Sequence, residues 1–422
     1  MSRKQICLWV FLIVWLSHFL SKTITVTDSV WTLPLSVSIE RGHKTSLDDY
    51  KSAIEAKHYY AIEIVNEDDY YFLPVGTSLL IAPMVKALDV FCKKVLYLDV
   101  NDTIKNGYGN GIELFFASLL VAVTSVFIFL IAFEITAAKW QSVLAVFVFA
   151  FCTSAWSTGS RALWSHTASM LMLSIALFAL LRAKQNQRWL IVAGLALAYS
   201  YVVRPTNSLS IIFFSLYVVA AYRQLGFAYF IGLGVVLFPF VAYNYHIYHH
   251  LLSTYYTPGH LGVGGNSLLK EALLSHLFSP ARGLFVFSPV LVCSVLGAGM
   301  MIRNKIFGLL DVAVLLIILS HYYVISSIST PFAGWSFGPR YFCDMMPFFI
   351  YFFIFFVSYL VQMNMQVTKY ALAALLLIAM STSFFINYKG ATHPATFMWN
   401  AQPDIDTHPE RVWDWNDLQF MR

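Results

Sequence analysis

The chain has 422 residues, of which 59% are hydrophobic and only 12% are charged, and its formal net charge is +5. Soluble domains carry about 25% charged residues, so this composition leaves too little polar surface for a water-soluble globule. No basic run resembles a nucleic-acid patch. The five scattered cysteines include no CxxC pair, which argues against a zinc site or a disulfide framework.

The apolar residues form blocks of about 18–22 residues, the length a helix needs to cross a hydrocarbon core of roughly 30 Å. Backbone amides in lipid must be bonded internally, and a barrel would show short alternating segments instead. We therefore predict an all-α integral membrane protein with about eleven transmembrane helices and a large first extracytoplasmic loop containing interfacial helices. The predicted spans are 5–22, 111–133, 141–156, 164–182, 189–203, 207–222, 226–243, 284–302, 306–326, 342–362 and 369–387.

The first span has the outline of a secretory signal, because Arg3 and Lys4 precede an apolar run. No small-x-small cleavage pattern follows it, and Trp9 and Trp15 suit a retained helix. We predict that this span is not cleaved.

The first outer loop is expected at 23–110, with Asp28 only a few residues past the first span and so near the lipid headgroups. Within this loop, residues 72–92 are apolar but contain two prolines and Lys86. This pattern predicts an interfacial helix lying on the bilayer. The alternative is a twelfth span, which would invert everything downstream.

The short connections decide the orientation, because basic residues favour the cytoplasmic side. With eleven spans, one side receives Arg3, Lys4, Lys139, Arg182, Lys184, Arg188, Arg223, Arg303, Lys305 and Lys369. The N-terminus is then cytoplasmic, and the tail 388–422 is extracytoplasmic. We expect Trp413 and Trp415 of this tail to cover the site or to contact the acceptor.

Four arginines break this rule by falling on the outer side. Arg161, Arg204 and Arg340 lie in short outer connections, and Arg282 ends a longer one at 244–283. An arginine held at that face usually pairs with an acid or binds an anion. The outer face is therefore where we expect the chemistry.

The order of these features resembles a known family. An acid after the first helix (Asp28), a large first outer loop, a proline-containing interfacial segment and some eleven spans are similar to the C-type (GT-C fold) membrane glycosyltransferases. These include the protein mannosyltransferases and the aminoarabinose transferase that acts on lipid A. The stretches Phe72–Thr77, Arg161–His166 and Trp335–Arg340 resemble an uncharacterised bacterial branch. The resemblance covers nearly the whole chain, with 1–387 as the polytopic domain.

The resemblance implies transfer of one sugar from a polyprenyl-phosphate carrier to a lipid, glycan or protein acceptor. The reaction would take place on the outer face of a bacterial inner membrane. Asp28 matches the family's acid in the first outer loop. Many members carry two adjacent acids, whereas Ser29 follows here, so only the single acid is carried over. Assistance by a divalent metal stays open, and no residue is assigned as a metal ligand.

Sugar transfer needs a carboxylate to deprotonate or orient an acceptor hydroxyl, and cations to stabilise the departing phosphate. The arginine fork matches two phosphate oxygens. We therefore predict Asp28 as the catalytic carboxylate. The predicted substrate-binding residues are Arg161, His166, Arg204, Arg282, Arg340 and Asp344.

Each assignment has a structural alternative. Asp28 could cap the next helix, Arg340 could pair with Asp344 one turn later, and Arg204 could be a snorkelling anchor. A different class of function is a transporter or flippase for a lipid-linked or anionic substrate, which would place charges near the bilayer midplane and often shows paired repeats. A third is a non-catalytic membrane scaffold, which would not explain the outer arginines.

Overall fold

A computed structural model describes residues 1–42, 45–222, 226–252, 266–401 and 403–422. The described chain is mostly helical, and its β structure is one antiparallel pair of strands, β1 (Ile62–Val65) and β2 (Asp68–Tyr71). The prediction of a predominantly helical fold of the membrane type is therefore confirmed. Arg223, one of the basic residues used for orientation, lies outside the described residues.

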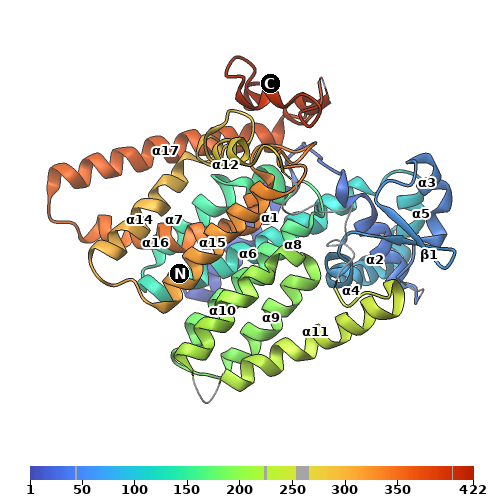
Figure 1. Cartoon of the computed structure of the whole chain (residues 1–422), viewed down its shortest axis with the longest axis horizontal. Coiled ribbons are helices and arrows are strands. Elements are labelled where there is room, and N and C mark those ends of the chain that lie inside the picture. The colour runs from blue at the N-terminus through green and yellow to red at the C-terminus, as the bar shows by residue number, and fades with distance from the viewer. Residues whose placement is uncertain (43–44, 223–225, 253–265, 402) are drawn as a thin grey trace.

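Helices occupy all eleven ranges predicted as spans (Figure 1). Six of them, within the described residues, are long and apolar enough to cross a membrane: α6, α8, α11, α15, α16 with the turn before it, and α17. The count of eleven spans stays a prediction. The helices are α1 (Arg3–Phe19), α6 (Asn110–Thr136), α7 (Lys139–Phe151), α8 (Ser165–Ala183), α9 (Trp189–Val203), α10 (Ser208–Ala221), α11 (Gly226–Tyr248), α14 (Val292–Arg303), α15 (Leu309–Ser327), α16 (Met346–Gln362) and α17 (Gln366–Thr392).

Small residues let some of these helices touch along their backbones. A Cβ atom on Gly194 of α9 would lie 2.1 Å from the carbonyl oxygen of Tyr229 in α11. A Cβ atom on Gly232 of α11 would lie 2.4 Å from the carbonyl oxygen of Ile191 in α9. Such close approach is typical of helix pairs in membranes, where packing rather than water exclusion drives association.

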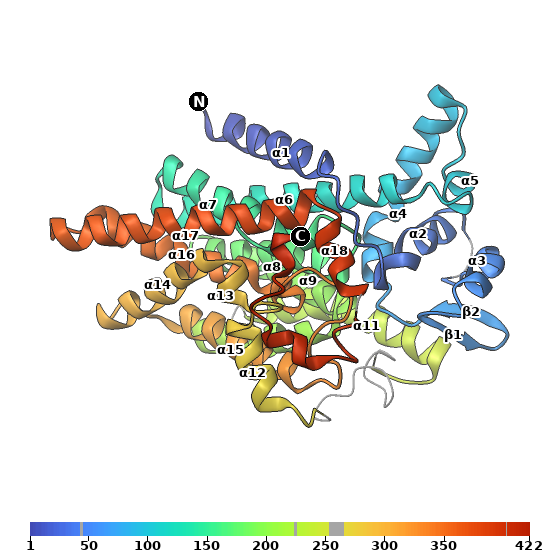
Figure 2. The same cartoon turned by 90° about the horizontal axis from the view of Figure 1, so that it is seen from above.

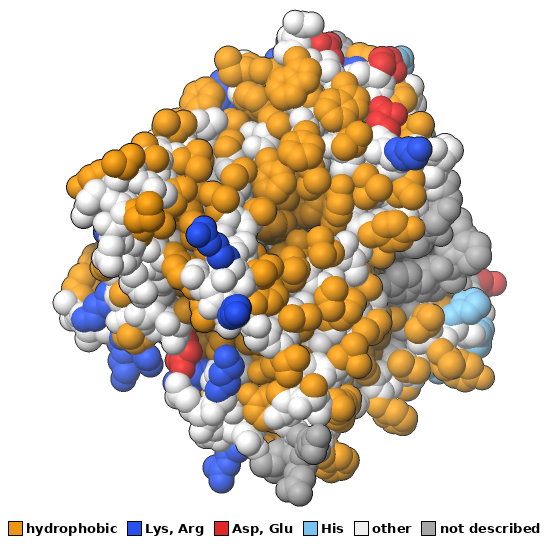
Figure 3. All heavy atoms as spheres, turned by 60° about the vertical axis from the view of Figure 1, so that its left-hand side comes forward, with side chains coloured by type: hydrophobic (Ala, Val, Ile, Leu, Met, Phe, Trp, Pro, Cys, Tyr) orange, Lys and Arg blue, Asp and Glu red, His pale blue; other side chains and the backbone are white. Residues whose placement is uncertain are grey.

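The outer helices keep large apolar side chains on their free faces. Phe238 of α11 is 79% exposed and Ile378 of α17 is 67% exposed. One face of the molecule is accordingly largely hydrophobic, with Lys and Arg side chains gathered in one part of it (Figure 3). A continuous apolar exterior of this kind indicates contact with lipid rather than water.

The first loop folds into short elements at one end of the bundle (Figures 1 and 2). Its helix α4 starts against the end of α9, where the Tyr199 hydroxyl donates to the carbonyl oxygen of Gly76 (2.9 Å). A helix is therefore present within the range 72–92, while its placement on the membrane surface stays a prediction. The helices of the loop are α2 (Thr32–Glu40), α3 (Lys51–Ala56), α4 (Gly76–Phe91) and α5 (Val100–Lys105).

The last outer elements are shorter still. The helix α12 (Leu269–Phe278) and the single turn α13 (Leu284–Phe287) precede α14, so the predicted span 284–302 is broken at Pro289. The tail contains α18 (Ala395–Met398) and three 3-10 turns, at 399–401, 409–413 and 419–421. The tail follows α17 and lies next to the C-terminal end of that helix (Figure 2).

Some of the basic connections lie together at one end of the bundle. At this end, Lys139 Nζ donates to the carbonyl oxygen of Met1 (3.0 Å), and Arg182 pairs with Glu134 (3.1 Å). The first loop and the tail meet at the other ends of the same helices. This separation fits the predicted sidedness, although which end faces the cytoplasm stays a prediction.

Candidate active site

The acid after the first helix is in contact with an arginine 312 positions later in the chain. Asp28 begins the 3-10 turn Asp28–Trp31. Its Oδ2 accepts a hydrogen bond from Arg340 Nη1 at 2.8 Å, and its Oδ1 accepts one from the Tyr60 hydroxyl at 2.6 Å. The Tyr71 hydroxyl donates to the backbone carbonyl of Asp28. The carboxylate is therefore fixed through both oxygens and through its own backbone.

Arg340 is held between aromatic rings. Its guanidinium carbon lies 4.5 Å from the ring centre of Trp164 and 5.5 Å from that of Tyr341. The chain turns sharply just before it, at Gly338, whose φ of +57° suits glycine. The arginine side chain is only 8% exposed, so its position is set by packing as well as by Asp28.

A second ionic cluster surrounds Asp344, which is fully buried. Arg204 Nε lies 3.1 Å from Asp344 Oδ2. His166 Nδ1 and His321 Nε2 lie 3.4 and 3.6 Å from Asp344 Oδ1. Three residues predicted to bind substrate, Arg204, His166 and Asp344, thus lie together, while His321 was missed because it stands inside an apolar span with no motif around it.

Two adjoining hollows surround the Asp28–Arg340 pair. The larger is a cavity of about 770 Å³ whose walls include Tyr60, Trp335 and Asp406. The smaller is a recess of about 70 Å³ whose walls include His166 and Arg204. Asp28 and Arg340 line both hollows, as do Leu73 and Tyr341. The ion pair therefore stands at the junction of a large polar and aromatic cavity with a small cationic recess.

The charge state of Asp28 follows from its neighbours. Burial raises the pKa of its carboxyl group, but Arg340 and the Tyr60 hydrogen bond outweigh burial, so the pKa lies below its ordinary value. Asp28 is therefore an anion at neutral pH. By contrast, burial and the nearby Asp404 raise the pKa of Asp406 in the same cavity.

Arg161 occupies a different place from the one expected for a substrate ligand. Its guanidinium is completely buried and donates to the backbone carbonyls of His18, Ser21 and Thr23. These carbonyls belong to the end of α1 and the segment leaving it. Arg161 is not among the described residues that line the two hollows. This placement favours a structural role, in which Arg161 fixes the path of the chain towards Asp28.

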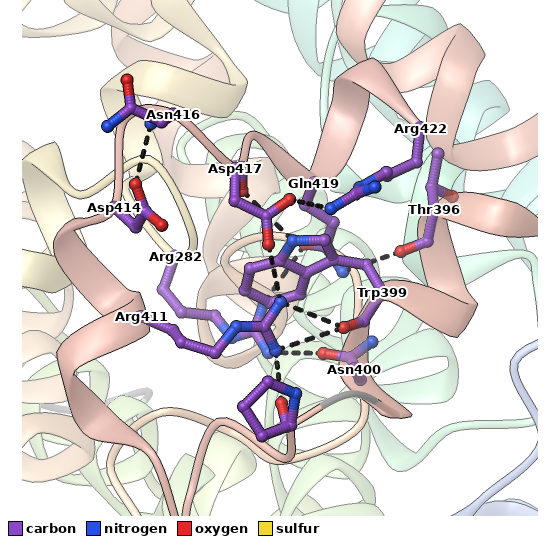
Figure 4. Close-up of polar contacts among 11 residues, drawn as sticks. Arg282, Thr396, Trp399, Asn400, Arg411, Asp414, Asn416, Asp417, Gln419 and Arg422 are labelled. Carbon is purple, nitrogen blue, oxygen red and sulfur yellow. Dashed lines mark hydrogen bonds and ion pairs between the residues drawn. The ribbon is translucent and has the colours of Figure 1, made fainter.

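Arg282 is also withdrawn from the hollows. It donates to the backbone carbonyls of Phe332 (2.6 Å) and Gly334 (2.8 Å), and to the side chains of Asn400 (2.9 Å) and Gln419 (3.2 Å). Figure 4 shows it beneath the tail. Its contacts join the loop before η8 (Arg340–Met345) to the C-terminal tail, so the geometry favours a clamp over the predicted substrate contact.

The tail clamp is completed by a stacked indole. The guanidinium carbons of Arg411 and Arg282 lie 3.9 and 5.7 Å from the ring centre of Trp399 (Figure 4). On the cavity side, Trp335 Nε1 donates to Asp404 Oδ2 (2.8 Å). The tail thus supplies Asp406 to the cavity wall. The contact expected of Trp413 and Trp415 is not seen among the described lining residues, and both side chains face outward.

A metal site is not evident. Among the residues that the structure describes, no three His, Cys, Asp or Glu side chains are grouped so that they could hold an ion. The described walls of the two hollows carry the carboxylates of Asp28 and Asp406, the guanidinium groups of Arg204 and Arg340, the imidazole of His166 and several tyrosine hydroxyls.

Comparison of the sequence with protein-family models and with curated proteins gave no match in either case. The case for a function therefore depends on the geometry of this site.

Proposed function

We propose that the chain is a membrane glycosyltransferase that moves a sugar from a polyprenyl-phosphate donor to an acceptor on the extracytoplasmic face. The observation that supports this most is the position of the Asp28–Arg340 pair. A base and a phosphate-binding cation stand 2.8 Å apart where a large cavity meets a small cationic recess. Two hollows that share Asp28 and Arg340 but differ in their other walls suit a donor whose sugar and phosphate need different surroundings.

The donor phosphate would enter the recess. Arg340 and Arg204 both line it, and His166 and the Ser165 hydroxyl lie beside them. Two planar guanidinium groups match the oxygens of a phosphate better than ammonium groups would. Residues 165 and 204 stand at the ends of α8 and α9, and the proposal puts these helix ends at the level of the lipid headgroups, where a lipid-linked phosphate would lie.

The reaction would run between the two hollows. Asp28 accepts the proton of an acceptor hydroxyl as that oxygen bonds to the anomeric carbon of the sugar. The bond from the anomeric carbon to the phosphate oxygen breaks, and its electrons leave with the polyprenyl phosphate. Arg340, with Arg204, stabilises the charge that develops on the departing phosphate. His166 would orient a sugar or phosphate oxygen.

The membrane setting belongs to the same proposal. In this proposal the chain has eleven spans, a cytoplasmic N-terminus and an extracytoplasmic tail, and it lies in a bacterial inner membrane. The basic connections at one end of the bundle and the site at the other end support this orientation.

The second candidate is a transporter or flippase of a lipid-linked or anionic substrate. One observation favours it: Asp344, Arg204, His166 and His321 form a buried charged cluster among apolar helices. Ionisable groups at such positions often line a substrate or proton path.

The test uses purified protein in lipid nanodiscs with radiolabelled polyprenyl-phosphate sugars. Release of polyprenyl phosphate and formation of a new glycoside or free sugar are measured for the wild type, Asp28→Asn and Asp102→Asn. Asp102 is an exposed acid of the same loop, outside the lining of both hollows. Asp28→Asn should lower turnover by about 10²–10⁴-fold, while Asp102→Asn should match the wild type.

Turnover that survives Asp28→Asn would contradict the assigned base. In proteoliposomes, movement of the labelled lipid between leaflets without release of sugar would favour the transporter.

A further inference from the structure

Tyr60, which no sequence motif singled out, is hydrogen-bonded to the carboxylate of Asp28. Tyr60 donates to Asp28 Oδ1 at 2.6 Å, while Arg340 donates to the other oxygen at 2.8 Å. We propose that Tyr60 is a positioning residue, which keeps Asp28 aimed into the large cavity when Arg340 turns to a phosphate in the recess. This inference rests on the proposed function for its phosphate, but its first test does not need a substrate.

The backbone that carries Tyr60 is unusual. His58, Tyr59 and Ala61 have φ values of +50°, +56° and +60°, although none of them is glycine. Non-glycine residues adopt this region rarely, and such residues collect at sites where the surroundings hold them in place. Tyr60 therefore reaches Asp28 from a turn whose backbone conformation its residues do not favour by themselves.

The turn is held by the same short segment that carries the acid. Trp31, which ends the 3-10 turn beginning at Asp28, is buried, and its Nε1 donates to the carbonyl oxygen of Tyr60 (2.8 Å). The Tyr60 hydroxyl then returns to Asp28. These two bonds fix the tyrosine and the carboxylate relative to each other without any contribution from Arg340.

The two partners of Asp28 differ in what else they can reach. Arg340 lines both the cavity and the recess, whereas Tyr60 is a wall residue of the cavity and not, in the described chain, of the recess. A phosphate in the recess therefore competes with Asp28 for the guanidinium but not for the tyrosine. After the arginine turns, the tyrosine bond is the one that holds the carboxylate.

The ionisable groups around Asp28 come from six segments of the chain. Arg340 lowers the pKa of Asp28 more than any other neighbour does, after burial has raised it. Tyr60 lowers it as well, so loss of either partner moves the pKa upward. The charged and titratable groups that line the cavity or the recess around Asp28 are Tyr60, Arg340, Tyr71, His166, Arg204, Tyr341, Lys57 and Asp406.

Tyr60 itself stays a donor. Burial and the adjacent Asp28 raise the pKa of its hydroxyl above the ordinary value. It therefore keeps its proton at neutral pH, where it serves as a donor to Asp28 rather than as the base. A base freed from its cation only when a phosphate is present would limit loss of sugar to water.

The experiment measures how readily carbodiimide labels Asp28 as a function of pH, because only the protonated carboxyl group reacts. Labelling is quantified by peptide mass spectrometry on the full-length protein in nanodiscs. Tyr60→Phe removes the hydroxyl alone, and Tyr59→Phe is the matched control, since Tyr59 is exposed and outside the lining of both hollows. Tyr60→Phe should raise the labelling midpoint by about one pH unit, the size of one lost hydrogen bond to an anion.

A second variant gives the opposite sign and avoids any doubt about folding. Fluorotyrosine in place of Tyr60 keeps nearly the same side-chain shape and makes the hydroxyl a stronger hydrogen-bond donor. The labelling midpoint of Asp28 should therefore fall. Addition of polyprenyl phosphate should raise the midpoint of the wild type, and raise that of Tyr60→Phe further.

Equal midpoints for the wild type, Tyr60→Phe and the fluorotyrosine protein would overturn the inference, whether or not sugar transfer is observed. If polyprenyl phosphate leaves the labelling midpoint of the wild type unchanged, the inferred movement of Arg340 from Asp28 to the phosphate is overturned. If the midpoints shift as expected but no donor is turned over, the positioning role stands and the proposed function fails.

Discussion

The clamp at Arg282 leads to a prediction that separates a structural arginine from a substrate-binding one. Its buried guanidinium donates to the carbonyl of the adjacent Ala281, to two backbone carbonyls of the loop, at Phe332 and Gly334, and to two tail side chains, Asn400 and Gln419. Arg282→Met keeps much of the apolar stem and removes all of these donors at once. The tail should then detach from the loop before η8, and Asp406 should leave the cavity wall.

The magnitude follows from the number of acceptors left behind. Each of the four neutral acceptors on the loop and the tail that loses its donor costs about 1–3 kcal/mol if it stays buried. Because water can reach a detached tail, we expect the lower part of the summed range, about 4 kcal/mol. This corresponds to a roughly 10³-fold rise in the population with a released tail.

Hydrogen exchange of the backbone amides in residues 403–422 measures this population directly. Arg422→Met is the matched control, because Arg422 is 54% exposed and its pair with Asp417 should contribute less than about 1 kcal/mol. Exchange should accelerate strongly in Arg282→Met and little in Arg422→Met. Unchanged exchange in Arg282→Met, together with weaker donor binding, would refute the clamp and restore the substrate-binding role.

Three further changes test the rest of the site. Asp344→Asn leaves the Arg204 guanidinium buried without its counter-charge, and thermal unfolding in detergent should show a loss of about 3–5 kcal/mol; a wild-type melting curve would contradict this. Glu113 Oε1 accepts from both Ser29 and Leu163, so Glu113→Gln should be tolerated while Glu113→Leu loses about 1–3 kcal/mol; equal stability of the two would contradict it. Arg340→Gln should raise the pKa of Asp28, and so the pH of half-labelling by carbodiimide, because the guanidinium favours the anion; a lower midpoint would contradict the pairing.

Hydropathy and charge predicted much of the architecture because both act locally. Blocks of apolar residues long enough to cross lipid mark helices wherever they occur, and helices were found in all eleven ranges. The same local reasoning placed Asp28 and Arg340 on one side of the membrane, and the structure has them in contact. Asp28 and Arg340 were both predicted to lie on the outer side and close to a helix end, and their contact agrees with these two conditions.

The roles of Arg161 and Arg282 were beyond this reasoning. Both were expected to hold substrate because a cation on the outer side needs a partner. Their partners are instead backbone carbonyls of distant segments, at Ser21 and Phe332 among others. A carbonyl is present at every residue, so the sequence carries no signal that distinguishes an arginine that binds carbonyls from one that binds phosphate.

Tyr60 and Asp406 were missed for a related reason. Tyr60 depends on a left-handed turn of non-glycine residues, which local preference disfavours. Asp406 depends on a tail held by contacts with Arg282 and Trp335. Both positions are set by tertiary contacts that override local pattern.

A double-mutant cycle on turnover of a polyprenyl-phosphate sugar tests the central claim most directly. The proteins compared are the wild type, Asp28→Asn, Arg340→Gln and the double variant. If the two residues act as one site, each single change should lower the rate by at least about 10²-fold, and the double variant should be little worse than the poorer single variant. A wild type that turns over no such donor, or losses that multiply as for independent residues, would contradict the account.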